Sequence, residues 1–163
     1  MGARRILAID PGRNTGIAVL GHSLEYVGVI SRTKGESQIN FAARTASAIS
    51  VILDGLCDLV YEGVQIYPST PVPNQDIIEL CYGTGFLIGM LTQNIQLRRV
   101  VRYAPREWKG QVPKEIHNLR IFEQLDVYGQ AKISKIPKGK QEHGLDAVGL
   151  ALFHKKQVDL LFK

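Results

Sequence analysis

Four polar residues stand where their side chains could bind divalent metal ions. Asp10 directly follows the apolar run 6–9, which has the length and composition of a strand buried on both faces. Open α/β sheets bind ligands at the carboxyl ends of such strands. Glu62 ends a second strand-length run, and His143 and Asp146 lie three residues apart where the last apolar helix pattern begins. Carboxylate oxygens and imidazole nitrogens bind divalent cations, so these four residues are candidate metal ligands.

Each of these residues, taken alone, also has a simpler explanation. Asp10 could bond the amides of the glycine-containing turn that follows it. Glu62 could be a surface acid at the end of its strand. Asp146 could stabilise the N-terminus of its helix through the helix dipole. The metal-binding hypothesis therefore depends on whether the fold brings the four side chains together.

The elements that must position these residues can be predicted from apolar periodicity. Residues 6–30 contain three strand-length runs with short links, which predict an antiparallel meander. Apolar residues at intervals of three and four predict a helix over residues 36–56, followed by a strand over residues 58–62. A strand reached through a helical crossover should lie parallel to one already in the sheet. If that partner is the first strand, Asp10 and Glu62 lie side by side, and their repulsion favours a bound cation.

The middle of the chain predicts a second helix and a fifth strand. The helix, over residues 75–94, contains Gly83, Gly85 and Gly89. Because glycine has a poor helix propensity, these positions indicate close packing against the sheet or, as the alternative, against a second subunit. Residues 98–103 form the fifth strand.

The segment before the last helix is predicted to contain one helix and one loop. The helix covers residues 113–126 and is expected to bury Ile116, Leu119 and Phe122. Residues 129–141 contain four lysines and no acid, which predicts a mobile basic loop outside the core.

Length and composition indicate a single globular domain over residues 1–163, with 45% hydrophobic and 21% charged residues. No membrane span or signal peptide is predicted. Cys57 and Cys81 lie in apolar surroundings without metal-type spacing, which indicates buried thiols in a reducing cytoplasm. The net charge is +5, and residues 97–140 hold 11 Lys and Arg against 4 Asp and Glu. This asymmetry is typical of a face for a polyanion, although a basic face that serves only solubility is an equal alternative.

Together, these motifs resemble the RuvC family of Holliday junction resolvases, within the RNase H-like nucleases. The resemblance is carried by residues 9–16 (Ile-Asp-Pro-Gly-Arg-Asn-Thr-Gly), 61–64 (Tyr-Glu-Gly-Val) and 143–152 (His-Gly-Leu-Asp-Ala-Val-Gly-Leu-Ala-Leu). It runs nearly end to end, and the compact form is closer to phage-encoded members. It implies an RNase H-like α/β domain whose five-stranded mixed sheet has three antiparallel and then two parallel strands, flanked by helices.

The resemblance also implies a Mg²⁺-dependent endonuclease that resolves four-way DNA junctions by paired nicks. Asp10 is expected to bridge two metal ions, with Glu62 on one side and His143 and Asp146 on the other. Two such ions can activate a water and stabilise the leaving oxygen of a phosphodiester, and Mn²⁺ is expected to substitute for Mg²⁺. Since the substrate has twofold symmetry, a homodimer is expected. No nucleotide cofactor is needed, and the expected location is the cytoplasm, that of the host for a phage-encoded protein.

Contacts with DNA are expected from basic residues near and beyond this site. By the resemblance, Lys109 and Lys114 contact phosphates, with Arg102 and Arg106 as further candidates. Nonspecific clamping of DNA is predicted for the lysines of the basic loop, which are Lys132, Lys135, Lys138 and Lys140. For each of these residues the alternative is an exposed side chain without a special role.

One position departs from the family. In bacterial members an aromatic residue three positions after the catalytic Glu probes the junction centre, but here that position is Gln65. Tyr67 could substitute by stacking on an unpaired base. Without such a residue, the alternatives are a broader flap and fork endonuclease or an RNA-processing RNase H-like nuclease. An actin-like ATPase would need two such domains around a nucleotide, and a junction-binding protein without catalysis would not need four candidate ligands.

Overall fold

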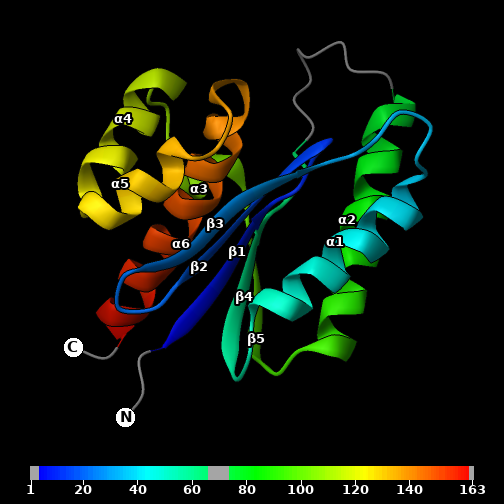
Figure 1. The fold of residues 1–163 in the computed structure, drawn as a ribbon, viewed down its shortest axis with the longest axis horizontal. Coiled ribbons are helices and arrows are strands. Elements are labelled where there is room, and N and C mark those ends of the chain that lie inside the picture. Colours follow the sequence, from blue (N-terminus) through cyan, green and yellow to red (C-terminus); the bar gives the residue numbers. More distant parts are fainter. Residues whose placement is uncertain (1–3, 66–73, 162–163) are drawn as a thin grey trace.

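The computed structural model describes residues 4–65 and 74–161, and a five-stranded mixed sheet forms its centre (Figure 1). The strands are β1 (Arg5–Asp10), β2 (Asn14–Leu20), β3 (Leu24–Ser31), β4 (Cys57–Glu62) and β5 (Leu97–Tyr103). They lie in the order β3-β2-β1-β4-β5. The first three form an antiparallel meander, whereas β4 lies parallel to both β1 and β5. This arrangement confirms the sheet and the fold class predicted from the sequence.

Helices cover the two faces of the sheet in separate layers (Figure 1). One layer consists of α1 (Gln38–Ile52) and α2 (Asn74–Asn94). The other contains α3 (Pro105–Trp108), α4 (Lys114–Gln124), α5 (Val127–Ser134), the 3₁₀ helix η1 (Lys138–Lys140) and α6 (Gln141–Leu161). Across the described ranges, no helix combines the length and apolarity that a membrane span requires.

Strand β1 is buried on both faces because a helical layer packs against each of them. Leu7 and Ile9 belong to the apolar cluster shared with α1 and α2, whereas Ile6 and Ala8 belong to the cluster shared with α6. This division follows from the alternation of side chains along a strand. The packing on both sides fixes the position of Asp10 at the end of β1.

Strand β3 is an edge of the sheet, and two basic side chains bond its terminal carbonyl groups. Lys132 donates through Nζ to the carbonyl of Leu24, at the start of the strand. Arg44, on α1, donates to the carbonyl of Ser31, at the end of the strand, over 2.9 Å. Both ends of this edge are therefore closed by side chains from the helical layers.

The prediction of a mobile basic loop over residues 129–141 is wrong. Helix α5 occupies Val127–Ser134, and η1 occupies Lys138–Lys140. The side chain of Asp126 caps α5 by accepting a hydrogen bond of 2.7 Å from the amide of Gly129. Ile133 and Ile136 are buried in the core cluster that includes α6, so the lysines lie on an element anchored by apolar contacts.

The apolar stripe predicted for the helix at 113–126 is wrong at two of its three residues, since Phe122 alone of the three packs, half-buried, against the core. Ile116 and Leu119 are 46% and 56% exposed, whereas Ile121 is only 4% exposed. The helix turns Ile121 toward Gly149 of α6, where the absence of a side chain leaves room for it. The core therefore contacts a different face of the helix from the one that the spacing of Ile116 and Leu119 indicated.

The glycines of α2 do not pack against the sheet. A Cβ atom on Gly85 or Gly89 would have no described atom within 4 Å, and one on Gly83 would meet the side chain of Gln38. The expectation of close packing against the sheet is therefore wrong. Gly85 and Gly89 lie on an open face of the helix, together with exposed apolar side chains such as Phe86.

Candidate active site

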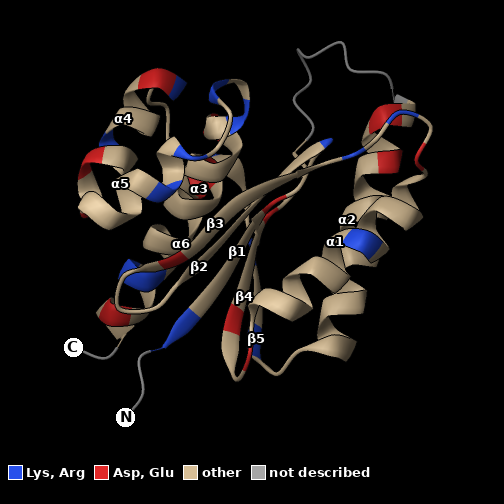
Figure 2. Ribbon diagram, in the orientation of Figure 1, with Lys and Arg blue, Asp and Glu red and all other residues tan. Residues whose placement is uncertain are grey.

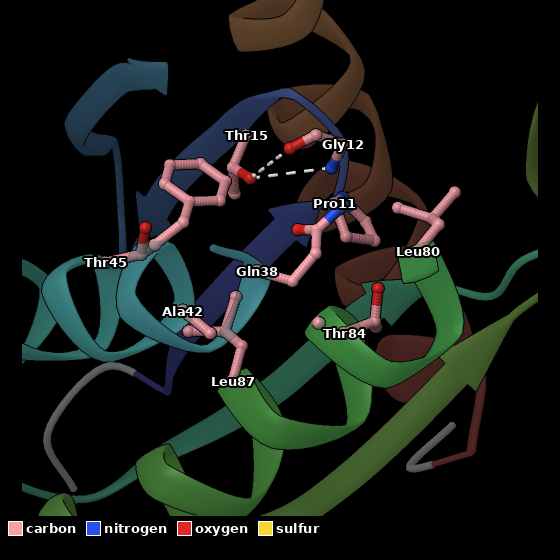
Figure 3. Close-up of a pocket in the computed structure, with 11 residues that line it drawn as sticks. Pro11, Gly12, Thr15, Gln38, Ala42, Thr45, Leu80, Thr84 and Leu87 are labelled. Carbon is pink, nitrogen blue, oxygen red and sulfur yellow. Dashed lines mark hydrogen bonds between the residues drawn. The ribbon is translucent and has the colours of Figure 1, made fainter. Parts of the chain in front are cut away.

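The carboxyl ends of β1 and β4 bring two acidic residues next to each other. The two strands are parallel neighbours, with Ile9 opposite Tyr61, so Asp10 and Glu62 come next in each strand. After Asp10 the chain turns back into β2. The hydroxyl of Thr15 stabilises this turn, because it donates to the carbonyl of Gly12 over 3.0 Å and accepts from the Gly12 amide over 3.4 Å (Figure 3).

Helix α6 supplies the other two candidate ligands, and its first turn lies directly on the sheet. Gly16 of β2 pairs with Asp10, and a Cβ atom on Gly16 would overlap the carbonyl oxygen of His143. Only glycine allows the helix to approach the strand this closely. As a result, His143 and Asp146 are held at the end of the sheet where Asp10 and Glu62 lie.

His143 lies between the Asp10 carboxylate and the side chain of Asn14. Its Nδ1 is 3.6 Å from Oδ2 of Asp10, and its Nε2 is 3.5 Å from Nδ2 of Asn14. The hydroxyl of Ser31 donates to Oδ1 of Asn14 over 2.7 Å. The Asp10 carboxylate beside the imidazole ring is the main reason why the pKa of His143 is raised. The sequence analysis missed Asn14 and Ser31, although Asn14 lies within the motif at residues 9–16.

Two lysines neutralise the acidic cluster. Nζ of Lys109 is 3.0 Å from Oε2 of Glu62 and 3.3 Å from Oδ2 of Asp146. Lys114 lies further out, with Nζ 3.8 Å from Oδ2 of Asp146 and 3.1 Å from Oε2 of Glu142. The ammonium group of Lys109 therefore lies between one acid from the sheet and one from α6.

Burial and mutual repulsion destabilise the charged forms of the acids. Burial raises the pKa of Glu62, and the negative charge of Asp10 adds to this effect. Burial and Asp10 likewise raise the pKa of Asp146. Burial opposes the charge of Lys109, but the carboxylates outweigh this effect and raise its pKa. The site is thus an acidic cluster whose carboxylates stabilise the charged form of Lys109.

Comparisons with known proteins show that several solved structures share the architecture of this protein. No family model matches the sequence, and no curated protein sequence is significantly similar to it. Thermus thermophilus RuvC, in a complex with a Holliday junction substrate, has a TM-score of 0.69 at 16% identity, over 96% of each chain. The Fowlpox virus resolvase, bound to Holliday junction DNA, has a TM-score of 0.61 at 16% identity, over 94% of this chain and 98% of the viral one. The yeast mitochondrial Holliday junction resolvase reaches 0.55 at 10% identity, over 99% and 87% of the two chains.

The chain has the RuvC fold. This fold explains why acids that are far apart in the sequence, such as Asp10 and Asp146, meet at one end of the sheet, as the RuvC resemblance of the sequence had implied.

The donor set in this RuvC fold suits a hard divalent cation. Among the described residues, no three His, Cys, Asp or Glu side chains lie close enough to hold an ion in their present positions. Lys109 lies instead between Glu62 and Asp146. Oδ1 of Asp146 is buried without a hydrogen-bond partner, which is costly for a carboxylate. A cation bound in place of the ammonium group would satisfy this oxygen and relieve the repulsion between the acids.

Trp108 is a site residue that the sequence analysis missed. Its indole Nε1 donates to Oε2 of Glu62 over 2.9 Å, although Trp108 and Glu62 are 46 positions apart. The signal available in the sequence was its position next to Lys109. A single tryptophan in an apolar chain is more readily interpreted as a core residue, so its hydrogen bond could be found only in three dimensions.

The predicted DNA-binding residues lie in several different environments. Lys132 bonds the carbonyl of Leu24, whereas Lys135 and Lys138 are exposed. Lys135 and Lys140 line an open groove beside β3. The aliphatic part of the Arg102 side chain covers Gly63, and Arg102 as a whole is exposed. Tyr67 lies outside the described residues.

Proposed function

We propose that this protein is a structure-specific DNA endonuclease that resolves Holliday junctions by hydrolysing two phosphodiester bonds. The observation that carries this proposal is the meeting of Asp10, Glu62, His143 and Asp146 at one end of the sheet in a RuvC fold. The resolvases of the same fold from Thermus thermophilus and Fowlpox virus are known in complexes with Holliday junctions. No observation favours a flap, fork or RNA substrate over the four-way junction.

In this function Asp10, Glu62, His143 and Asp146 would hold two Mg²⁺ ions, for which Mn²⁺ would substitute. When bound, the ions supply an activated water and stabilise the leaving 3′ oxygen. Asp10 and Glu62 contribute carboxylate oxygens from rigid strand ends. His143 binds through a neutral ring nitrogen, so its proton must leave before it can act as a ligand.

Basic residues around the site provide phosphate contacts in the same proposal. Lys109 and Lys114 already lie beside Asp146, and each carries an ammonium group that can bind a phosphate oxygen. Arg102, near the end of β5, and Arg106, on α3, are further candidates for such contacts. A further group of lysines lies between the end of α5 and the start of α6, where Figure 2 shows basic residues in blue, and it contains Lys135, Lys138 and Lys140. Because these contacts are electrostatic, DNA binding should weaken steeply with salt.

The protein would act as a homodimer, with one active site for each of the two nicked strands. The open face of α2 is the surface that we assign to this contact. It exposes Ile78, Tyr82 and Phe86, and it carries Gly85 and Gly89, which leave room for a second helix. Both cysteines are free thiols, which is compatible with a reducing cytoplasm as the place of action, but only Cys57 is buried as predicted, and Cys81 is exposed.

A nuclease assay on a synthetic four-way junction tests the proposed function. With Mg²⁺ or Mn²⁺, the unmodified protein should release paired nicked duplexes, and Asp146→Asn should lose at least 100-fold in rate because it removes a charged ligand. A Lys156→Ala variant, changed on the exposed far part of α6, serves as the matched control and should retain full activity. Equal cleavage of flaps or RNA duplexes would favour the broader nucleases, and metal-independent cleavage would contradict the proposal.

A further inference from the structure

Trp108 touches the candidate site through a single polar atom. The residue is the last of the short helix α3, and it is only 8% exposed. Its Nε1 donates to Oε2 of Glu62 over 2.9 Å, and the same oxygen is 3.0 Å from Nζ of Lys109. The indole N–H is therefore one of two described donors that orient this carboxylate oxygen.

Three neighbours hold the indole ring in this orientation. Cζ3 of the ring would lie 2.8 Å from a Cβ atom on Gly149, so α6 can approach the ring only through a glycine. The ring of His117 packs edge-on at 5.2 Å between centroids. Nζ of Lys109 lies 4.6 Å from the ring centroid on the face of the indole. Because the ring is enclosed in this way, its N–H group has a fixed direction.

The same ring links two candidate ligands that belong to different elements. Glu62 ends strand β4, whereas Asp146 lies on α6, one turn before Gly149. The indole bonds the first acid and packs against the helix that carries the second. The width of the indole ring therefore helps to set the separation between Glu62 and Asp146.

We infer that Trp108 is a positioning residue, which orients the Glu62 carboxylate toward the site and so supports its role as a metal ligand. This inference rests on the proposed function, since it assigns Glu62 and Asp146 as ligands. Groups that orient metal ligands from behind are commonly worth 10- to 100-fold in metal affinity. We expect Trp108 to affect metal affinity by this factor through its bond to Glu62, without contacting metal or DNA itself.

The variant Trp108→Phe tests the inference because it keeps an aromatic ring and removes the N–H donor. We expect Mn²⁺ to bind about 10- to 100-fold more weakly, as measured from the signal of free Mn²⁺ in electron paramagnetic resonance. Tyr103→Phe is the matched control. It removes a half-buried aromatic hydroxyl that bonds His154 over 2.9 Å, and it should leave Mn²⁺ affinity unchanged. Equal affinities for Trp108→Phe and the unmodified protein would overturn the inference.

The unmodified protein offers a second test that does not depend on folding of the variant. Trp108 is the one tryptophan in the sequence, so all indole fluorescence reports on the hydrogen bond to Glu62. Mg²⁺, which is not paramagnetic, should change the emission of Trp108 as it binds, and the midpoint of this change should match the midpoint of Mg²⁺ binding. Glu62→Gln should abolish the change. If metal binds without any change in emission, the inference about Trp108 is contradicted but the proposed function is not. If the unmodified protein binds neither metal, the proposed function is also overturned, which separates the two failures.

Discussion

At the scale of single residues, Lys109 balances the charge of the acidic cluster when no metal is bound. Its ammonium group contacts both Glu62 and Asp146, and burial makes the two negative charges costly without a partner. A metal ion bound by these acids would take over the same role. Lys109 and a divalent cation should therefore compete for the two carboxylates.

The variant Lys109→Met should reveal this competition. We expect the metal-free protein to lose about 2 kcal/mol of unfolding free energy, less than for a fully buried ion pair because the Lys109 side chain is 24% exposed. Added Mg²⁺ should stabilise this variant more than the unmodified protein. Urea unfolding with and without Mg²⁺ measures both effects, and Lys138→Met, at an exposed position, is the control. An unchanged metal-free stability would contradict the assigned role of Lys109.

The sequence allowed the four candidate ligands to be predicted because each follows a recognisable local pattern. Asp10 and Glu62 end strand-length apolar runs, and His143 and Asp146 open a helix. Trp108 could not be predicted in the same way. Its role depends on the direction of one N–H group, and this direction is set by packing against elements that are distant in the sequence.

At the scale of secondary structure elements, the contact between β2 and the start of α6 positions the site. Gly16 lies against the backbone of His143, and this contact is possible only without a side chain. Gly16→Ala should therefore push α6 away from the sheet and cost about 1–3 kcal/mol of unfolding free energy. Because α6 carries two candidate ligands, Mn²⁺ affinity should fall at the same time.

Gly12→Ala provides the matched control for this substitution. Gly12 lies in the turn between β1 and β2, and a Cβ atom there would make only ordinary contacts, at 3.6 Å and beyond. Thermal unfolding and Mn²⁺ binding should therefore change much less than in Gly16→Ala. If the two alanine variants proved equally stable, the close approach of α6 to β2 would not be the reason why position 16 requires glycine.

The elements were predicted best where apolar periodicity was strong and unambiguous. The five strands and the parallel pairing of β1 with β4 followed from strand-length runs and a helical crossover. Helix α5 was missed because four lysines and two glycines dominate residues 129–141, although Asp126 and Gly129 form a recognisable helix start. The exposure of Ile116 and Leu119 could not be foreseen, since the buried face of that helix depends on the space beside Gly149.

At the scale of the whole molecule, a buried ionic network closes the end of the sheet away from the candidate site. Asp58 is fully buried, and its Oδ2 is 3.2 Å from Nε2 of His154, whose Nδ1 is 2.9 Å from the hydroxyl of Tyr103. Arg4 and Arg99 also face Asp58, at 3.3 and 3.6 Å. Burial lowers the pKa of His154, and this effect outweighs the attraction of Asp58.

This network should make stability depend on pH. In the unfolded chain His154 regains its ordinary pKa of about 6.5, so the unfolded state binds the proton more tightly than the folded state does. The contribution of neutral His154 is therefore complete above pH 6.5 and is lost progressively as the pH falls below it. Urea unfolding at pH 7.5 and 5.5 should show a smaller loss in His154→Gln than in the unmodified protein. His143, whose pKa is raised, is present in both proteins and cancels in this comparison.

The proposed dimer can be tested on the open face of α2. Phe86→Glu would place a charge in the assigned contact, so we expect a monomer in analytical ultracentrifugation where the unmodified protein sediments as a dimer. Val51→Glu changes an apolar side chain on α1 that is 88% exposed, and it should leave the mass unchanged. A dimer that survives Phe86→Glu would exclude this face of α2 as the interface.

The capped edge of the sheet limits how two copies of this protein can meet. An unprotected edge strand invites pairing with the edge of another molecule, which would join two sheets into one and can continue into aggregates. Lys132 and Arg44 already engage the outermost carbonyl groups of β3, so a second chain would have to displace both cations before it could add a strand there. Growth through this edge into continuous sheets of indefinite length is thereby hindered, which favours contacts between copies at other surfaces, such as the face of α2 assigned to the proposed dimer.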